Sequence, residues 1–339
     1  MGAIWFDPGQ LADNLHEIVG YKAGVAVSIE ELCDLLSESG HADTIRISEE
    51  NVTRIRSEDY EDLYFSILYR IGHTESKHNG ILDMFTLSRN IVEKHGEKFA
   101  NGLLRIYSDG CERLFHEAAK SGAKSLDPTS IVMEAYSQFG RYGADAIIQL
   151  IEMQERIRRL SPHGGGRWVE WKNTIPLSGI FSRSSNDKAH GEFIDQRLID
   201  FLSNNPDILP KMYWRKFEEL AAEHFHRLGF KVELGPGQND DGVDLRLWLP
   251  TESQESEMQL HIVQCKRTKD KVDKLVVKGL YADVQHEGAA LGVLVTTSEL
   301  TLGAKQTISS RGYPIEEVDG AKVVEWLSNL RTPGSGIVR

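Results

Sequence analysis

Four polar side chains interrupt or border apolar stretches in the C-terminal half of this 339-residue sequence. Glu218 lies in WRKFEELAAEHFHRLGF, Asp244 ends the tripeptide GVD, and Gln264 and Lys266 stand on either side of Cys265. Carboxylate and amide oxygens are ligands that hard cations accept, and an ammonium stabilises negative charge. What chemistry these groups can do depends on whether folding brings them together.

The glutamate lies on a predicted helix. Apolar residues recur at helical spacing from Phe217 to Leu228. At about 100° per residue, Glu218 falls on the shoulder of this apolar stripe and can face inward, whereas Glu219 points to the opposite side, where we expect it to be solvated. Gly229 suits the left-handed conformation that ends many helices.

The other three residues lie on a predicted β-hairpin. Its strands are the apolar segments Val243–Leu249 and Met258–Lys266, and the polar run TESQESE lies in the loop between them. Because side chains alternate along a strand, Gln264 and Lys266 share one face, and Cys265 takes the other as a small buried apolar residue.

The register of this hairpin decides whether a site forms. A register that pairs Pro250 with Met258 places Asp244 opposite Gln264, and so gathers an acid, an amide and an ammonium. A slip of one residue would turn Asp244 to the other face.

The motifs resemble a known family. A helix bearing FEELAAEHFHRLGF, followed in order by GVD, QCKR and LVTTS, is similar to the Mrr-like branch of the PD-(D/E)XK nuclease superfamily, over roughly Phe193 to Leu330. The resemblance implies an α/β fold with a restriction-endonuclease-like mixed sheet flanked by helices. It also implies a metal-dependent endonuclease that hydrolyses DNA phosphodiester bonds, in restriction or anti-phage defence.

The resemblance gives each polar residue a role. Asp244 and Gln264 would bind Mg²⁺, for which Mn²⁺ would substitute, and Glu218 would supply the negative charge that an amide lacks. Lys266 would stabilise charge on the scissile phosphate or orient the attacking water. Because Gln264 stands where the superfamily usually has an acid, we expect weaker metal binding.

A basic ridge follows the predicted site, and we expect it to contact DNA phosphates, although a solvated face is an equal alternative for its helical part. It consists of Arg267, Lys269, Lys271, Lys274 and Lys278. The chain has a net charge of −12, but residues 211–339 hold 17 basic and 19 acidic residues, against 22 and 32 in residues 1–210. Most of the excess negative charge therefore lies in residues 1–210, which is compatible with DNA binding by residues 211–339.

The periodicity changes along the chain and predicts three parts. Residues 1–160 are expected to form a mostly α-helical domain, in which Ser28 and Glu31 have the spacing of a capping box. Residues 161–190 contain Pro, Gly and Ser and are expected to be a linker. Helices and apolar strands then alternate over residues 191–332, the expected nuclease domain.

Composition excludes several other classes. The three cysteines are widely spaced, which argues against a disulfide framework and a zinc site. No apolar run is long enough to span a bilayer and the N-terminus has no signal-peptide pattern, so we expect a cytoplasmic protein.

Two further hypotheses remain open. The C-terminal part could be a DNA-binding or partner-binding module whose site has lost hydrolysis through the glutamine. Residues 1–160 could be a regulatory, recognition or homo-oligomerisation domain, and a defence-system protein could be a partner.

Overall fold

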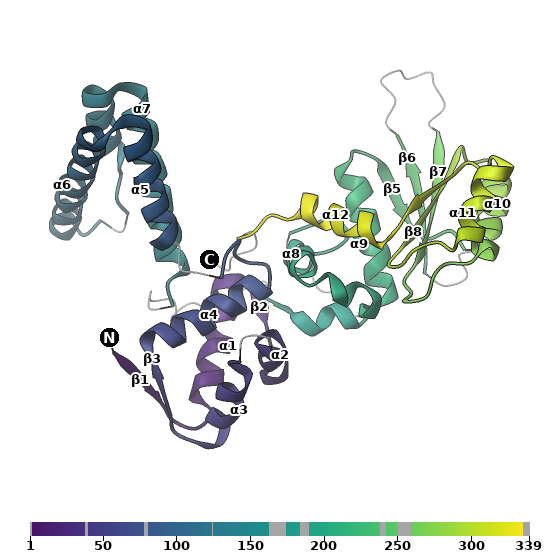
Figure 1. Cartoon of the computed structure of the whole chain (residues 1–339), viewed down its shortest axis with the longest axis horizontal. Helices are drawn as coiled ribbons and strands as arrows, with labels where there is room; N and C mark the ends of the chain where they lie inside the picture. The colour runs from purple at the N-terminus through teal and green to yellow at the C-terminus, as the bar shows by residue number, and fades with distance from the viewer. Residues whose placement is uncertain are drawn as a thin grey trace. The chain divides into compact units, whose positions relative to one another are not determined.

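The computed structural model describes residues 2–37, 40–77, 81–123, 125–162, 174–183, 190–237, 242–249 and 259–334. The chain divides into two compact units, one formed by residues 1–77 together with 166–339 and the other by residues 78–165 (Figure 1). The expected helical region over 1–160 is therefore divided between the two units.

The first 77 residues are mostly helical. Their elements are β1 (Ala3–Phe6), α1 (Gln10–Ala23), β2 (Val25–Ala26), α2 (Ile29–Leu35), α3 (Ala42–Glu50), β3 (Thr53–Arg56) and α4 (Ser57–Arg70). Strands β1 and β3 pair antiparallel. The predicted capping box is confirmed, because Ser28 Oγ accepts the Glu31 N–H and the Glu31 carboxylate accepts the Ser28 N–H.

This front part is bound to the C-terminal part by contacts that composition does not reveal. The guanidinium of Arg197 donates to the Gly24 carbonyl at 2.7 Å, and that of Arg331 donates to the Thr74 carbonyl at 2.8 Å. Strand β2 pairs parallel with β4 (Ile175–Pro176). The structure thus divides the chain differently from an expected boundary at residue 160.

Part of the expected linker is built into the fold. Strand β4 leads into a 3-10 helix, Leu177–Phe181, and both Leu177 and Ile180 are buried. The remainder of the predicted linker, residues 163–173 and 184–189, lies outside the described residues.

The second unit consists of three helices, α5 (Ile81–His95), α6 (Glu97–Ser121) and α7 (Thr129–Leu160). Glycines on α6 allow close packing against α7. A Cβ at Gly102 would lie 2.6 Å from the Phe139 ring, and one at Gly110 would lie 2.6 Å from Ile131. The helical prediction for this stretch is confirmed.

A five-stranded mixed sheet organises the C-terminal part. Its elements are α8 (Gln196–Asn204), a 3-10 helix (Pro206–Lys211), α9 (Trp214–Arg227), β5 (Lys231–Leu234), β6 (Leu245–Trp248), β7 (Leu260–Lys266), α10 (Lys274–Glu287), β8 (Leu291–Thr296), α11 (Leu302–Arg311), β9 (Ile315–Val318) and α12 (Gly320–Leu330). The strand order is β5-β6-β7-β8-β9. Strands β5, β6 and β7 pair antiparallel, whereas β7, β8 and β9 pair parallel.

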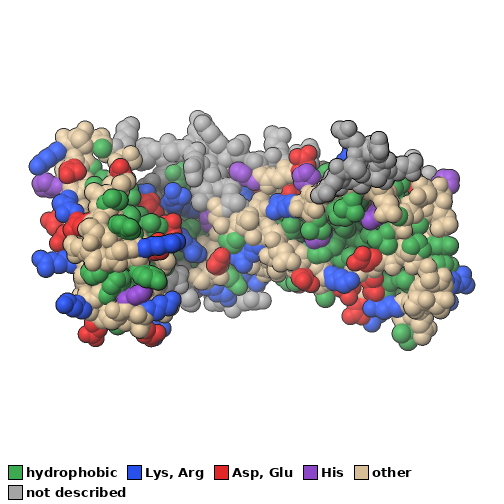
Figure 2. Space-filling view, turned by 90° about the horizontal axis from the view of Figure 1, so that it is seen from above, with side chains coloured by type: hydrophobic (Ala, Val, Ile, Leu, Met, Phe, Trp, Pro, Cys, Tyr) green, Lys and Arg blue, Asp and Glu red, His purple; other side chains and the backbone are tan. Residues whose placement is uncertain are grey.

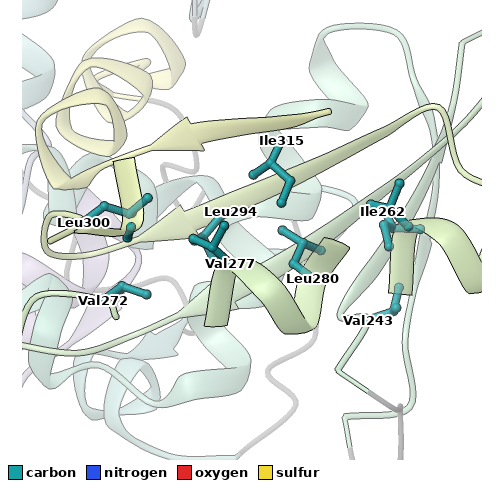
Figure 3. Close-up of a cluster of buried hydrophobic side chains, with 10 residues drawn as sticks. Val243, Ile262, Val272, Val277, Leu280, Leu294, Leu300 and Ile315 are labelled. Carbon is teal, nitrogen blue, oxygen red and sulfur yellow. The ribbon is translucent and has the colours of Figure 1, made fainter. Parts of the chain in front are cut away.

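Helices cover both faces of this sheet, as the sequence predicts, with α9 and α12 on one side and α10 and α11 on the other (Figure 1). Buried side chains of the sheet and of α10 form a continuous core, in which Ile262 and Leu294 meet Val277 and Leu280 (Figure 3). The mixed α/β fold class predicted for this region is confirmed.

Two exclusions can be checked against the structure. All three cysteines are free. Among the described residues, no helix has the length and apolarity needed to cross a membrane.

Candidate active site

The hairpin has the register that a common site requires. Leu245 pairs with Val263 and Trp248 with Leu260, and continuing this register by one residue sets Asp244 opposite Gln264. Pro250 and Met258, which this register would pair, lie outside the described residues.

Glu218 and Asp244 form the centre of the site. Both are buried, and their carboxyl groups are hydrogen-bonded to each other. Burial and the nearby negative charge of Asp244 raise the pKa of Glu218 to about 7, against the opposing effect of Arg215. The pair therefore carries less negative charge at neutral pH than two separate carboxylates would.

Arg215 is a site residue that the sequence did not predict. It lies one helical turn before Glu218, donates to the Glu218 carboxylate at 2.8 Å and also donates to the Gly235 carbonyl at 2.7 Å. The sequence does contain a signal for this contact, because side chains three residues apart on a helix are neighbours.

Glu219 differs from the prediction. Its carboxylate accepts from the ammonium of Lys216 at 2.8 Å, and the side chains of both residues are largely buried. The prediction that Glu219 is solvated was wrong because a helix side that is polar by periodicity can still be covered by another part of the chain.

Backbone hydrogen bonds fix Asp244 between the two strands. Its N–H donates to the Val263 carbonyl at 2.9 Å, and its carboxylate accepts the Cys265 N–H at 2.6 Å. Strand β7 thus holds the carboxylate directly. Burial and the charges of Asp244 and Glu218 raise the pKa of the Cys265 thiol, so this thiol stays protonated and unreactive.

Gln264 presents an oxygen that has no hydrogen-bond partner. Its Nε2 donates to the Gly242 carbonyl at 3.0 Å. Its Oε1 is buried and unpaired within the described part of the chain. A buried acceptor without a donor is costly, and a cation would satisfy it.

Lys266 ends β7 and is half-buried. The strand end is tied to β8, since Thr296 Oγ1 donates to the Lys266 carbonyl at 2.8 Å and the Thr297 N–H donates to it at 3.3 Å. The Thr297 hydroxyl also exchanges hydrogen bonds with the backbone of Thr268. The LVTTS motif therefore positions the lysine strand, a role that sequence reasoning did not assign.

The predicted basic ridge comes from the loop after β7 and the start of α10. Arg267, Lys269, Lys271 and Lys274 are exposed, and Lys278 is half-buried. Two of them already have partners, because Lys271 pairs with Glu299 at 2.8 Å and Arg267 donates to the Pro210 carbonyl. On the face drawn in Figure 2, side chains of both signs are interspersed.

Asp283 on α10 also approaches the site, and sequence reasoning missed it. A Cβ built on Gly242 would lie 3.1 Å from Gln264 Nε2 and 3.5 Å from Asp283 Oδ2. An acid on the polar side of an amphipathic helix gives no signal of its own in the sequence.

The residues present fit a hard divalent cation. No group of three His, Cys, Asp or Glu side chains suited to a metal occurs among the described residues. Mg²⁺ needs only one or two carboxylates, which Glu218 and Asp244 would supply, and the unpaired Gln264 Oε1 would be an additional neutral ligand.

A family model and a curated relative match parts of this chain. The Mrr_cat family model, described as a restriction endonuclease, matches residues 209–327. A curated relative from Sinorhizobium fredii, "Uncharacterized protein y4cE", is 25% identical over 214 residues, which are 62% of this chain and 52% of the relative. The chain thus spans about half the length of the curated relative that it matches.

Two solved structures are also similar. MspJI restriction endonuclease in complex with a 27-mer oligonucleotide is 19% identical, with a TM-score of 0.29, over 57% of this chain and 39% of that one. The DNA modification-dependent restriction endonuclease AspBHI is 21% identical, with a TM-score of 0.31, over 52% and 45%.

The family match confirms the resemblance drawn from the motifs, and it covers all four candidate residues. Residues 209–327 of this chain match the Mrr_cat model of restriction endonuclease domains.

Proposed function

We propose that this chain is an endonuclease that hydrolyses DNA phosphodiester bonds with Mg²⁺, for which Mn²⁺ substitutes. The observation that supports this most is the buried contact between the Glu218 and Asp244 carboxyl groups. A low-dielectric position for two carboxylates is unfavourable without a cation, and the match to a restriction endonuclease domain gives the nuclease class.

Each residue has a part in this proposal. Glu218, Asp244 and Gln264 Oε1 would hold the cation, which when bound supplies charge that favours deprotonation of water and stabilises the phosphate. Asp244 is kept in place by the Cys265 N–H. Lys266, on the strand end fixed by Thr296, stabilises the charge that develops on the phosphate.

The exposed members of the basic ridge would bind the DNA backbone on either side of the cleaved bond. Contacts of this kind position DNA without reading its sequence. We place the protein in the cytoplasm, in restriction or defence against foreign DNA, with a defence-system protein as a possible partner, because the family is described as restriction endonucleases.

The test is a plasmid cleavage assay with the full chain. We expect nicking or cutting with Mg²⁺ or Mn²⁺, none with EDTA, and a loss of about 100-fold or more in Lys266→Ala. Lys322→Ala on α12 is the matched control, because it removes an exposed lysine outside the basic ridge and should keep the cleavage rate. Equal rates in wild type and Lys266→Ala would contradict the proposal.

A second candidate is a module that holds DNA without cutting it. It is favoured by Gln264, an uncharged ligand, and by the lack of a three-residue ligand group among the described residues. Calorimetry that detects no Mg²⁺ binding, together with DNA binding that weakens with salt, would support this candidate over the nuclease.

We also propose that the unit of residues 78–165 joins two copies of the chain. Large apolar side chains are exposed on its two longest helices: Leu104, Phe115, Met133 and Tyr136. Light scattering should show a dimer that Leu104→Ser with Phe115→Ser converts to a monomer. A monomer in the wild type at high concentration would contradict this.

A further inference from the structure

We propose that Asp283 on α10 orients the side-chain amide of Gln264, so that Oε1 is the atom offered to a cation. In this arrangement Asp283 makes position 264 specific for glutamine over glutamate. The inference rests on the proposed metal site, but its main test uses neither metal nor cleavage.

The first step is the orientation of the amide. Gln264 Nε2 lies 3.0 Å from the Gly242 carbonyl oxygen. A carbonyl only accepts hydrogen bonds, so the NH₂ group must face it. The oxygen is thereby turned to the other side, where it is buried and has no partner among the described residues. The side chain of Gln264 is 7% exposed, so water does not satisfy this oxygen easily.

The second step is the position of Asp283. The point where a Cβ of Gly242 would stand is 3.1 Å from Gln264 Nε2 and 3.5 Å from Asp283 Oδ2. Gly242 has φ of 88°, a conformation that glycine adopts readily. Without a side chain at residue 242, the amide nitrogen and the carboxylate can flank the same small space.

A neighbouring ion pair supports this placement of α10. Glu287, one helical turn after Asp283, pairs with Arg246 of β6 at 2.6 Å. The start of β6 therefore lies alongside α10, with Gly242 near Asp283 and Arg246 paired with Glu287.

The third step is charge. The NH₂ group of Gln264 carries two hydrogens, one for the Gly242 carbonyl and one that can face the Asp283 carboxylate. A glutamate at position 264 would instead set carboxylate oxygens against a carbonyl and a second carboxylate, which repel each other. At the strand position where the superfamily usually has an acid, this chain thus has the neutral Gln264, and the acid Asp283 lies next to it on α10.

The test is a double-mutant cycle on thermal unfolding of the full chain in EDTA at pH 8. Gln264→Glu should lower the melting temperature by roughly 5 °C. Adding Asp283→Asn should recover at least half of that loss, because the new amide donates to the introduced carboxylate. Glu287→Gln is the matched control on the same helix and should recover none of it.

Mn²⁺ binding measured by electron paramagnetic resonance gives a second readout. Asp283→Ala should weaken Mn²⁺ binding about tenfold, a typical effect of losing a group that orients a ligand, and Glu287→Ala should not. Coupling in the melting cycle without Mn²⁺ binding to any variant would overturn the proposed function and support the orienting role. Melting losses that simply add, with Asp283→Asn no better than Glu287→Gln, would overturn the orienting role whatever the metal result.

Discussion

Glu218 of α9 and Asp244, just before β6, place their carboxyl groups in hydrogen-bonding contact inside the fold. Helix α9 packs on β5, β6 and β7, and this packing carries the glutamate to the strands. Only Arg215 offsets the charge on the Glu218 side at close range in the described part of the chain. Ionisation of both carboxyl groups therefore lowers the stability of the folded protein.

This cost predicts how stability depends on pH. The pKa of Glu218 is raised from an ordinary 4.5 to about 7, so its favourable contribution is complete below pH 4.5 and is lost as pH rises through 7. Glu218→Gln should therefore stabilise the metal-free protein at pH 8.5 by about 1–3 kcal/mol, allowing for partial solvent screening. The gain should vanish toward pH 4.5.

Chemical denaturation of wild type and Glu218→Gln in EDTA at both pH values measures this. Glu219→Gln is the control, because its carboxylate pairs with Lys216 and its loss should destabilise the protein at pH 8.5. A Glu218→Gln protein that is less stable at pH 8.5 than wild type would contradict the raised pKa.

The tie between β8 and β7 gives a second prediction. Thr296→Val keeps the shape of the side chain but removes the hydrogen bond to the Lys266 carbonyl, so it should cost about 1–2 kcal/mol of stability. It should also slow cleavage about tenfold or more, since Lys266 would lose its fixed position.

Thr307→Val on α11 is the matched control for this change. Its hydroxyl donates to the Gly303 carbonyl at an exposed site, so stability should change by less than about 0.5 kcal/mol and cleavage should not change. Equal effects of the two substitutions on cleavage would show that the Thr296 hydroxyl does not position the lysine.

The basic ridge gives a third prediction, on salt dependence. If Lys269 contacts a phosphate, Lys269→Ala should reduce the slope of log affinity against log salt by about 1. Lys271→Ala should reduce it less, because its ammonium already pairs with Glu299. Fluorescence anisotropy in EDTA from 50 to 200 mM salt measures the slopes, with Lys322→Ala on α12 as the control. Unchanged slopes in both Lys269→Ala and Lys271→Ala would remove these two lysines from the DNA interface.

Local pattern was enough to predict the elements around the sheet. Strand β8 (Leu291–Thr296) and helix α12 (Gly320–Leu330) lie within residues 191–332, where helices and apolar strands were predicted to alternate. Strand alternation left the hairpin register open, and the structure has the register that a common site requires. Buried strands and amphipathic helices carry these signals in their own residues.

The features that sequence reasoning missed depend on contacts between distant segments. Arg197 with Gly24 joins the first 77 residues to the C-terminal part, and the covered position of Glu219 depends on tertiary packing that its own helix does not encode. Asp283 reaches Gly242 only because α10 lies against the sheet. No local periodicity encodes any of these relationships.

The central claim is that the Glu218–Asp244 pair holds a divalent cation, and direct Mn²⁺ binding tests it best. Asp244→Asn keeps an oxygen for the Cys265 N–H but removes the charge, and Asp270→Asn is the control on the exposed loop after β7. We predict one bound ion in wild type and in Asp270→Asn, and binding at least about 100-fold weaker in Asp244→Asn. Equal Mn²⁺ affinity in wild type and Asp244→Asn would contradict the claim.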